Sequence, residues 1–344
     1  MDKRLLNVLK GKTENQVPFW FMRQAGRYLP EYREVRATCP SFMDFCYTPD
    51  KAAEVTLQPI RRYGMDGAIL FADILVVPDG LGQKVWFEAG KGPQLEAIKD
   101  GIDLAKLSMD RFHDRVGNVY ETLTRLKQDL PRETTLLGFA GAPWTVATYM
   151  LEGAGSKDHA TAKKFGYQNP DLMQNLMDIL VESTSEYLIA QIRAGADAVQ
   201  IFDSWAGSLS ELAFRDWVIA PTVKIIEKIR AACPETPIIG FPRLAGPMSV
   251  DYLAATKVDC IGLDTSMKLD WARDHLQRDT CVQGNLDPQL VVAGGSRMLE
   301  EAERILTTFK DGRHIFNLGH GFTPDCPPEH VAALSEFIQN FRKD

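Results

Sequence analysis

The chain has 344 residues, 45% of them hydrophobic, and a formal net charge of −7. This composition supplies a large core, its acidic balance argues against a nucleic-acid partner, and no stretch approaches the roughly 18–20 unbroken apolar residues of a membrane span. The first residues lack the apolar centre of a signal peptide and the six cysteines form no C-x-x-C pair. We therefore expect a cytoplasmic protein with reduced thiols and no cysteine-bound metal.

Eight short apolar runs follow one another along the chain, and most are continuous rather than alternating. Continuous runs predict strands whose two faces are both buried in a parallel sheet. The runs are residues 18–22, 68–71, 136–139, 198–202, 238–241, 260–263, 281–283 and 314–318.

Helical patterns lie between these runs. Thr48 followed by Pro49 predicts the start of a helix that ends at Gly64. Pro170 begins a second pattern with apolar residues at helical spacing, and residues 331–341 present one apolar face of a last helix. The alternation of strands and helices predicts a single (β/α)8 TIM-type barrel, with residues 1–344 as one catalytic domain.

The uneven spacing of the runs predicts long loops after the early strands of this barrel. A doubly wound open sheet is the alternative fold. Its usual dinucleotide site is missing, because no G-x-G-x-x-G follows the first run. The barrel is therefore the preferred prediction.

Two arginines, Arg23 and Arg27, follow the end of the first run. Two guanidinium groups crowded at one strand end repel each other unless an anion lies between them. Arginine is also the residue suited to two-point capture of a carboxylate or phosphate. The segment therefore predicts an anion site, with pairing to structural Asp or Glu residues as the alternative.

Other polar residues follow the later runs, at the barrel end where active sites are built. Asp73 follows the second run among apolar neighbours, where it either caps a turn or serves the site. Tyr149, Ser204 and His320 follow the third, fourth and eighth runs, and two glycines flank His320. These residues show no Ser-His-Asp triad order, no strand-end lysine suggests a Schiff base, and His320 and Cys326 do not match compact zinc spacing.

Six segments carry a resemblance to the uroporphyrinogen decarboxylase family. They read PFWFMRQAGRYLPEYR, PSFMDFCYTPD, ILFADILVVPDGLG, GFAGAPWTVATYMLEG, IFDSWAG and NLGHG, and span nearly the whole chain. The resemblance implies a distorted (β/α)8 barrel, a homodimer, and catalysis without metal or organic cofactor. The implied reaction decarboxylates the four acetate side chains of uroporphyrinogen III to methyl groups, giving coproporphyrinogen III in haem and tetrapyrrole biosynthesis.

The resemblance also implies roles for single residues. Arg23 and Arg27 bind substrate carboxylates, and Asp73 is the catalytic residue, placed against the pyrrole N–H groups at the centre of the macrocycle. We expect Asp73 to stay ionised with substrate bound, because N–H donors and nearby arginine favour the charged form. The other implied substrate-binding residues are Gln24, Ala25, Gly26, Phe42, Tyr149, Ser204 and His320.

The sequence does not choose the proton donor for the reaction, for which His320 and Tyr149 are both candidates. Two other functions stay open. A corrinoid or thiol methyltransferase would need a zinc site of His and Cys residues. A non-catalytic tetrapyrrole carrier would keep the arginines without needing Asp73.

Overall fold

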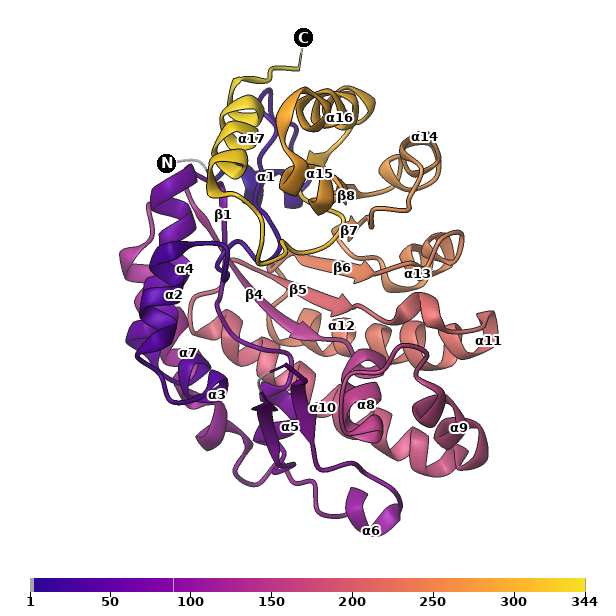
Figure 1. Cartoon of the computed structure of the whole chain (residues 1–344). Coiled ribbons are helices and arrows are strands. Elements are labelled where there is room, and N and C mark those ends of the chain that lie inside the picture. The colour runs from indigo at the N-terminus through magenta and orange to yellow at the C-terminus, as the bar shows by residue number, and fades with distance from the viewer. Residues whose placement is uncertain (1–2, 89, 344) are drawn as a thin grey trace.

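The computed structural model describes residues 3–88 and 90–343, and its centre is one curled parallel sheet (Figure 1). Seven strands form this sheet in the order β1-β4-β5-β6-β7-β8-β9, and a separate antiparallel hairpin pairs β2 with β3. The strands are β1 (Gly67–Ile69), β2 (Val85–Glu88), β3 (Gly92–Leu95), β4 (Thr135–Gly141), β5 (Ala198–Asp203), β6 (Ile238–Pro242), β7 (Cys260–Gly262), β8 (Cys281–Gln283) and β9 (His314–Ile315).

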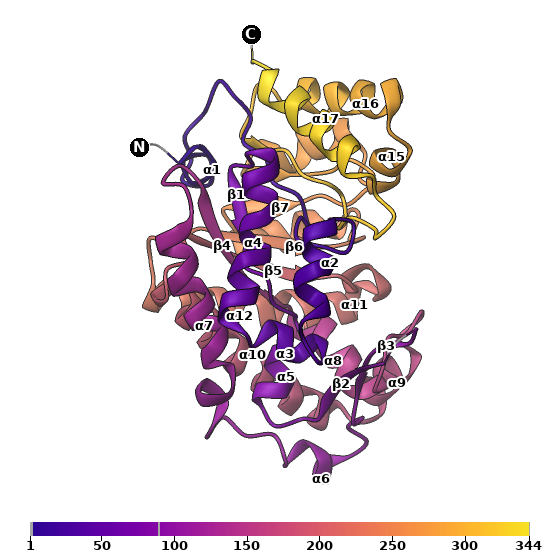
Figure 2. The ribbon, with the colours of Figure 1, turned by 60° about the vertical axis from the view of Figure 1, so that its left-hand side comes forward.

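Helices follow most of the sheet strands, as the alternating pattern predicted. They are α1 (Arg4–Leu9), α2 (Pro30–Ala37), α3 (Phe42–Cys46), α4 (Pro49–Tyr63), α5 (Val76–Gly80), α6 (Gly101–Leu104), α7 (Phe112–Asp129), α8 (Pro143–Glu152), α9 (Ala160–Gln168), α10 (Pro170–Arg193), α11 (Glu211–Phe214), α12 (Ala220–Ala232), α13 (Met248–Thr256), α14 (Leu269–Ala272), α15 (Pro288–Ala293), α16 (Gly295–Thr308) and α17 (Pro328–Asn340). One 3-10 segment, η1 (Ala206–Ser208), and two π-helical segments, η2 (Arg215–Ile219) and η3 (Arg273–Gln277), complete them. Figure 2 shows α2 and α4 in front of the β1 end of the sheet.

The predicted barrel class is confirmed, but the first predicted strand is corrected. Residues 18–22 form only one bridge, Phe19 with Phe316. Their backbone still lies between β9 and β1, because Trp20 N–H donates to Phe316 O at 3.3 Å and Asp66 N–H donates to Phe19 O at 2.9 Å. The segment thus occupies the eighth position of the barrel without forming a ladder.

Side chains explain why no ladder forms at residues 18–22. The Phe19 N–H donates to a carboxylate oxygen of Asp66, and the Met22 N–H donates to Asn317 Oδ1. The Phe21 N–H donates to Gln24 Oε1. These donors are therefore satisfied, but not by the carbonyls of a neighbouring strand.

The helix ends predicted by proline and glycine are confirmed. Helix α4 begins at Pro49 and is capped by Gly64 in the left-handed conformation, at φ 61°. Thr48 does not cap it with its side chain; its hydroxyl donates instead to Asp44 O at 2.6 Å. The hairpin of β2 and β3 was not predicted, because its strands are only partly buried and lack a continuous apolar run.

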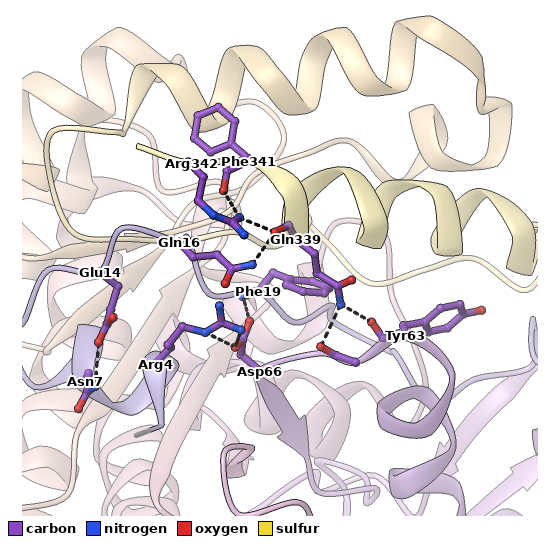
Figure 3. A network of polar contacts seen from close by, with 11 residues as sticks. Arg4, Asn7, Glu14, Gln16, Phe19, Tyr63, Asp66, Gln339, Phe341 and Arg342 are labelled. Atoms are coloured by element: carbon purple, nitrogen blue, oxygen red, sulfur yellow. Dashed lines mark hydrogen bonds and ion pairs between the residues drawn. The ribbon is translucent and has the colours of Figure 1, made fainter. Parts of the chain in front are cut away.

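The amino-terminal end of the barrel is closed. Leu5 and Leu9 of α1 pack in one buried cluster with Trp20, Ile239 and other strand residues. At the same end of the strands, Gln16 Nε2 donates to Gln339 O at 2.6 Å, which ties the two ends of the chain together (Figure 3). Only the carboxyl end of the strands is left to build a site.

No helix within the described residues is long and apolar enough to cross a membrane.

His314 in β9 makes the stability of the fold depend on pH. It is fully buried, its Nε2 lies 3.0 Å from Gly284 O, and burial lowers its pKa from 6.5 to about 3. Between these two pH values the His314 imidazole is protonated in the unfolded chain but neutral in the folded chain. The free energy of unfolding therefore decreases as the pH falls from 6.5 towards 3.

We expect His314→Gln to remove part of this pH dependence. At about pH 5 the wild-type protein should have lost about 2 kcal/mol of unfolding free energy through this group. Urea unfolding at about pH 7.5 and about pH 5 measures the loss, which should shrink in the variant. The exposed His275→Gln is the control, and an equal loss in both variants would contradict the assignment.

Candidate active site

Arg23 and Arg27 lie at the carboxyl end of the barrel as exposed side chains. Neither forms an ion pair with any carboxylate in residues 3–88 and 90–343, so the structure does not bear out the alternative of pairing with structural Asp or Glu residues. Arg23 has φ 60°, a left-handed conformation that is unusual for a residue with a side chain. Strain of this kind persists only where the surroundings hold it, and it clusters at functional sites.

The residues between the two arginines have different surroundings. Gln24 is fully buried, donates from Nε2 to Gly67 O at 3.1 Å and accepts the Phe21 N–H, so its side chain holds the turn against β1. Ala25 and Gly26 are partly exposed. Their N–H groups donate to no acceptor in the described part of the chain.

Only one of the two carboxylate oxygens of Asp73 is used in a hydrogen bond within the described structure. Its Oδ1 accepts the Leu75 N–H at 2.9 Å, so Asp73 does cap a turn, as one reading of the sequence proposed. Its Oδ2 has no hydrogen-bond partner among the described residues. Burial raises the pKa of Asp73 above its ordinary value, although the Leu75 N–H and the charge of Arg23 oppose this effect.

Arg23 connects Asp73 electrostatically with two other predicted residues. Its charge lowers the pKa values of Asp73, Tyr149 and His320. Burial is the largest effect on Tyr149 and raises its pKa, and the charge of Asp73 raises it further. The structure thus brings Arg23, Asp73, Tyr149 and His320 into one electrostatic neighbourhood.

His320 is held neutral in this neighbourhood. Burial, then Arg23 and Arg243, lower its pKa to about 4, and Asp264 opposes them. Packing explains why a glycine follows His320: a Cβ at Gly321 would lie 2.4 Å from the Arg23 side chain. At neutral pH the imidazole of His320 therefore carries no charge, and one ring nitrogen is a donor and the other an acceptor.

Ser204 follows β5 beside a buried carboxyl. Asp203 accepts the Thr145 hydroxyl at 2.5 Å, and burial raises its pKa to about 7. Thr145 lies in the first turn of α8, the helix that carries Tyr149. This contact therefore joins the loop of Ser204 to the helix of Tyr149. Ser204 O also accepts from Arg243 Nη1 at 3.4 Å.

Aromatic rings form a wall beside Asp73. Phe42 lies 4.6 Å from Phe87 and 6.0 Å from Phe71 between ring centroids, and Phe71 continues the wall to Phe45 at 4.7 Å. Phe42 was predicted, whereas Phe87 was missed because its hairpin was missed. Such a wall suits a flat, largely apolar ring system.

Sequence reasoning also missed Arg243 and Asp203. Both stand at strand ends, which is the signal that could have found them. Asp203 directly follows the apolar run 198–202, and Arg243 follows the run 238–241 after one proline. Arg27 affects only the pKa of Tyr32, so the electrostatic effects do not connect it to Asp73. Within the described ranges, no group of three or more His, Cys, Asp or Glu side chains is arranged to hold a metal ion.

Comparison with solved structures shows the fold. A methyltransferase from Methanosarcina mazei is 19% identical with a TM-score of 0.80, and the match covers 97% of each chain. A B12-independent methionine synthase from Shewanella sp. W3-18-1 is 12% identical with a TM-score of 0.53, covering 84% of this chain and 86% of the other. At these identities the likeness concerns architecture alone.

Comparison of sequences is more specific. The family model described as uroporphyrinogen decarboxylase (URO-D) matches residues 1–341. The uroporphyrinogen decarboxylase of Paracoccus denitrificans (strain Pd 1222) is 51% identical over 339 residues, which are 98% of this chain and 99% of that one. The enzyme of the same name from Agrobacterium fabrum (strain C58 / ATCC 33970) is 51% identical over 98% of both chains. The chain therefore belongs to the uroporphyrinogen decarboxylase family.

Proposed function

We propose that the chain carries out the reaction for which its family is named. It removes the four acetate carboxyl groups of uroporphyrinogen III as CO2 and leaves methyl groups, giving coproporphyrinogen III in haem and tetrapyrrole biosynthesis. The observation that carries the proposal is the position of Arg23 next to Asp73. Arg23 is a cation without an ion-pair partner among the described residues, and Asp73 uses only Oδ1 in a hydrogen bond there.

The chemistry explains why one carboxylate belongs at the centre of this site. Loss of CO2 from a pyrrole acetate needs somewhere for the electron pair of the broken C–C bond to go. Protonation of a ring carbon makes a cationic pyrrole that accepts this pair, and each acetate then takes up one proton in total as it becomes a methyl group. Asp73 stabilises the cation by its charge.

The protonation state of Asp73 follows from the same geometry. Burial raises its pKa, but Oδ2 is available to accept pyrrole N–H donors that favour the charged form. We therefore keep the prediction that Asp73 stays ionised with substrate bound. His320 contributes as a neutral hydrogen-bonding group, because its pKa of about 4 leaves no imidazolium to donate a proton at neutral pH.

The remaining predicted residues would contact the periphery of the macrocycle. Arg23 and Arg27 would bind carboxylates by two-point contacts. The free N–H groups of Ala25 and Gly26 would add donors to the same anions, while Gln24 supports the turn. Phe42 would pack on the ring, and Tyr149 and Ser204 would border it.

Four broader features belong to the same proposal. A homodimer, a cytoplasmic location and catalysis without metal or organic cofactor are supported by the family to which the chain belongs. Residues 1–344 as a single domain are supported by the sheet, because β1 and β4 to β9 all belong to one curled sheet.

The test is an anaerobic, reducing incubation with uroporphyrinogen III, with a chelator present and no metal added. Chromatography of the oxidised products separates them by carboxylate number. We expect a ladder from eight carboxylates down to four. Retention of all eight by correctly folded protein would contradict the proposal and leave a carrier or a methyltransferase.

A further inference from the structure

Arg243 stands at the carboxyl end of β6, and none of the roles above uses its side chain. Its backbone N–H donates to Asp203 O at 3.0 Å, and its Nη1 donates to Ser204 O in a long bond of 3.4 Å. Its Nε is buried and has no hydrogen-bond partner among the described residues. The guanidinium group is thus held in place with part of its donor edge unused, a costly arrangement for a buried donor.

Asp264, the carboxylate whose charge acts on Arg243, already accepts hydrogen bonds at both of its oxygens. Its Oδ2 accepts the Leu244 N–H at 2.7 Å, and its Oδ1 accepts the N–H and the hydroxyl of Ser266 at 2.8 and 2.6 Å. Asp264 raises the pKa of Arg243 from a distance, but the two residues form no ion pair in the described part of the chain. Arg243 therefore remains a cation without a direct counter-ion.

Arg23 likewise forms no ion pair with a carboxylate among the described residues. Its charge lowers the pKa of Arg243, and both arginines lower the pKa of His320. Two guanidinium groups in one partly buried site repel each other unless an anion is bound near both. The repulsion is therefore evidence for an anionic ligand in this part of the site.

The position of Arg243 relative to Asp73 indicates which part of a tetrapyrrole it meets. Asp73 follows β1, whereas Arg243 follows β6, and β4 and β5 lie between these two strands in the sheet. Asp73 is the proposed centre of the site, where the pyrrole N–H groups lie. Arg243 is accordingly at the periphery, where a porphyrinogen carries its carboxylates.

We propose that Arg243 is a third carboxylate-binding arginine, which takes one side-chain carboxylate of the tetrapyrrole on the side bordered by Ser204 and His320. The identity of the anion rests on the proposed function. The carboxylate belongs either to an acetate, which the reaction removes, or to a propionate, which it leaves.

The experiment compares Arg243→Gln and Arg243→Lys with the wild type and with Arg297→Gln as the matched control. Arg297 is 77% exposed on α16, and among the described residues its one ion-pair partner is Glu300. We expect Arg243→Gln to raise KM for uroporphyrinogen III about tenfold to a hundredfold, with a smaller change in kcat. This is the loss of affinity expected when one hydrogen bond to a charged group is removed. Arg243→Lys should recover part of the affinity, since lysine keeps the charge but loses the planar donor edge.

Fluorescence quenching gives a second readout that does not need turnover. The dissociation constants of uroporphyrin and coproporphyrin are measured for each variant. If Arg243→Gln weakens both ligands equally, the bound carboxylate is a propionate; if only uroporphyrin is weakened, it is an acetate.

Two results would overturn the inference. One is a wild-type KM and wild-type porphyrin affinity in Arg243→Gln. The other is a lowered Tm and kcat with unchanged affinities, which would make Arg243 a support for the Ser204 loop. If the wild type binds uroporphyrin but releases no CO2, the proposed function fails while the binding measurements still decide the role of Arg243.

Discussion

Asp73→Asn is expected to lower the turnover of uroporphyrinogen III by about 10²–10³, the loss typical of removing one preorganised electrostatic group. The asparagine keeps the size of the side chain and an oxygen for the Leu75 N–H, but it carries no charge to stabilise a cationic pyrrole. Substrate binding through Arg23 and Arg27 should persist. The loss is therefore expected in kcat more than in KM.

The pH profile adds a second readout for Asp73. Burial raises its pKa, so the wild-type rate should decline as the pH falls through this raised value and the carboxylate is protonated. The variant should lack that decline. Asp110→Asn is the control, because Asp110 is exposed and its carboxylate forms no hydrogen bond or ion pair within the described residues. Full activity and an unchanged pH profile in Asp73→Asn would refute the catalytic role.

Asp66→Ala is expected to lower the free energy of unfolding by about 3 kcal/mol, because it leaves buried partners without an acceptor. The Asp66 carboxylate precedes β1, accepts the Phe19 N–H at 3.0 Å and pairs with Arg4 at 2.8 Å (Figure 3). Its side chain is 7% exposed, whereas that of Arg4 is 33% exposed. The orphaned Phe19 N–H should therefore account for more of the loss than the ion pair.

Urea unfolding at neutral pH measures this effect. Glu54→Gln is the control, because it breaks a pair between Glu54 and Arg61 that is exposed on α4, and such pairs contribute about 0–1 kcal/mol. If Asp66→Ala costs no more than the control, the Asp66 carboxylate does not hold residues 18–22 in the barrel.

Much of the barrel is readable from the sequence because its strands are buried on both faces. Runs such as 198–202 and 281–283 are mostly apolar and coincide with β5 and β8. Their single polar residues, Gln200 and Gln283, are buried and hydrogen-bond to each other. Local chemistry was equally readable at helix ends, where Pro49 starts α4 and Gly64 supplies a left-handed cap. These features depend on residues that are neighbours in sequence.

The site was only partly predictable for the same reason. Asp73 and His320 each stand one residue beyond an apolar run, so their place at the barrel mouth followed from the fold class. Arg243 stands in the same kind of position. The sequence does not show, however, that the oxygens of Asp264 are already used in hydrogen bonds with other residues. Phe87 lies in a hairpin whose partly buried strands leave no continuous apolar run.

The sequence by itself determined the family, the barrel class, most strand positions and the set of polar residues that follow the strands. Only the tertiary structure decided that residues 18–22 close the barrel through a single bridge. It also decided that Arg23 and Arg243 both act on His320 and form no ion pair among the described residues. The physical reason is that these properties depend on partners distant in sequence. Asp66 and Asn317 take the N–H groups that a strand would share, and Ser266 occupies the carboxylate that Arg243 would otherwise meet.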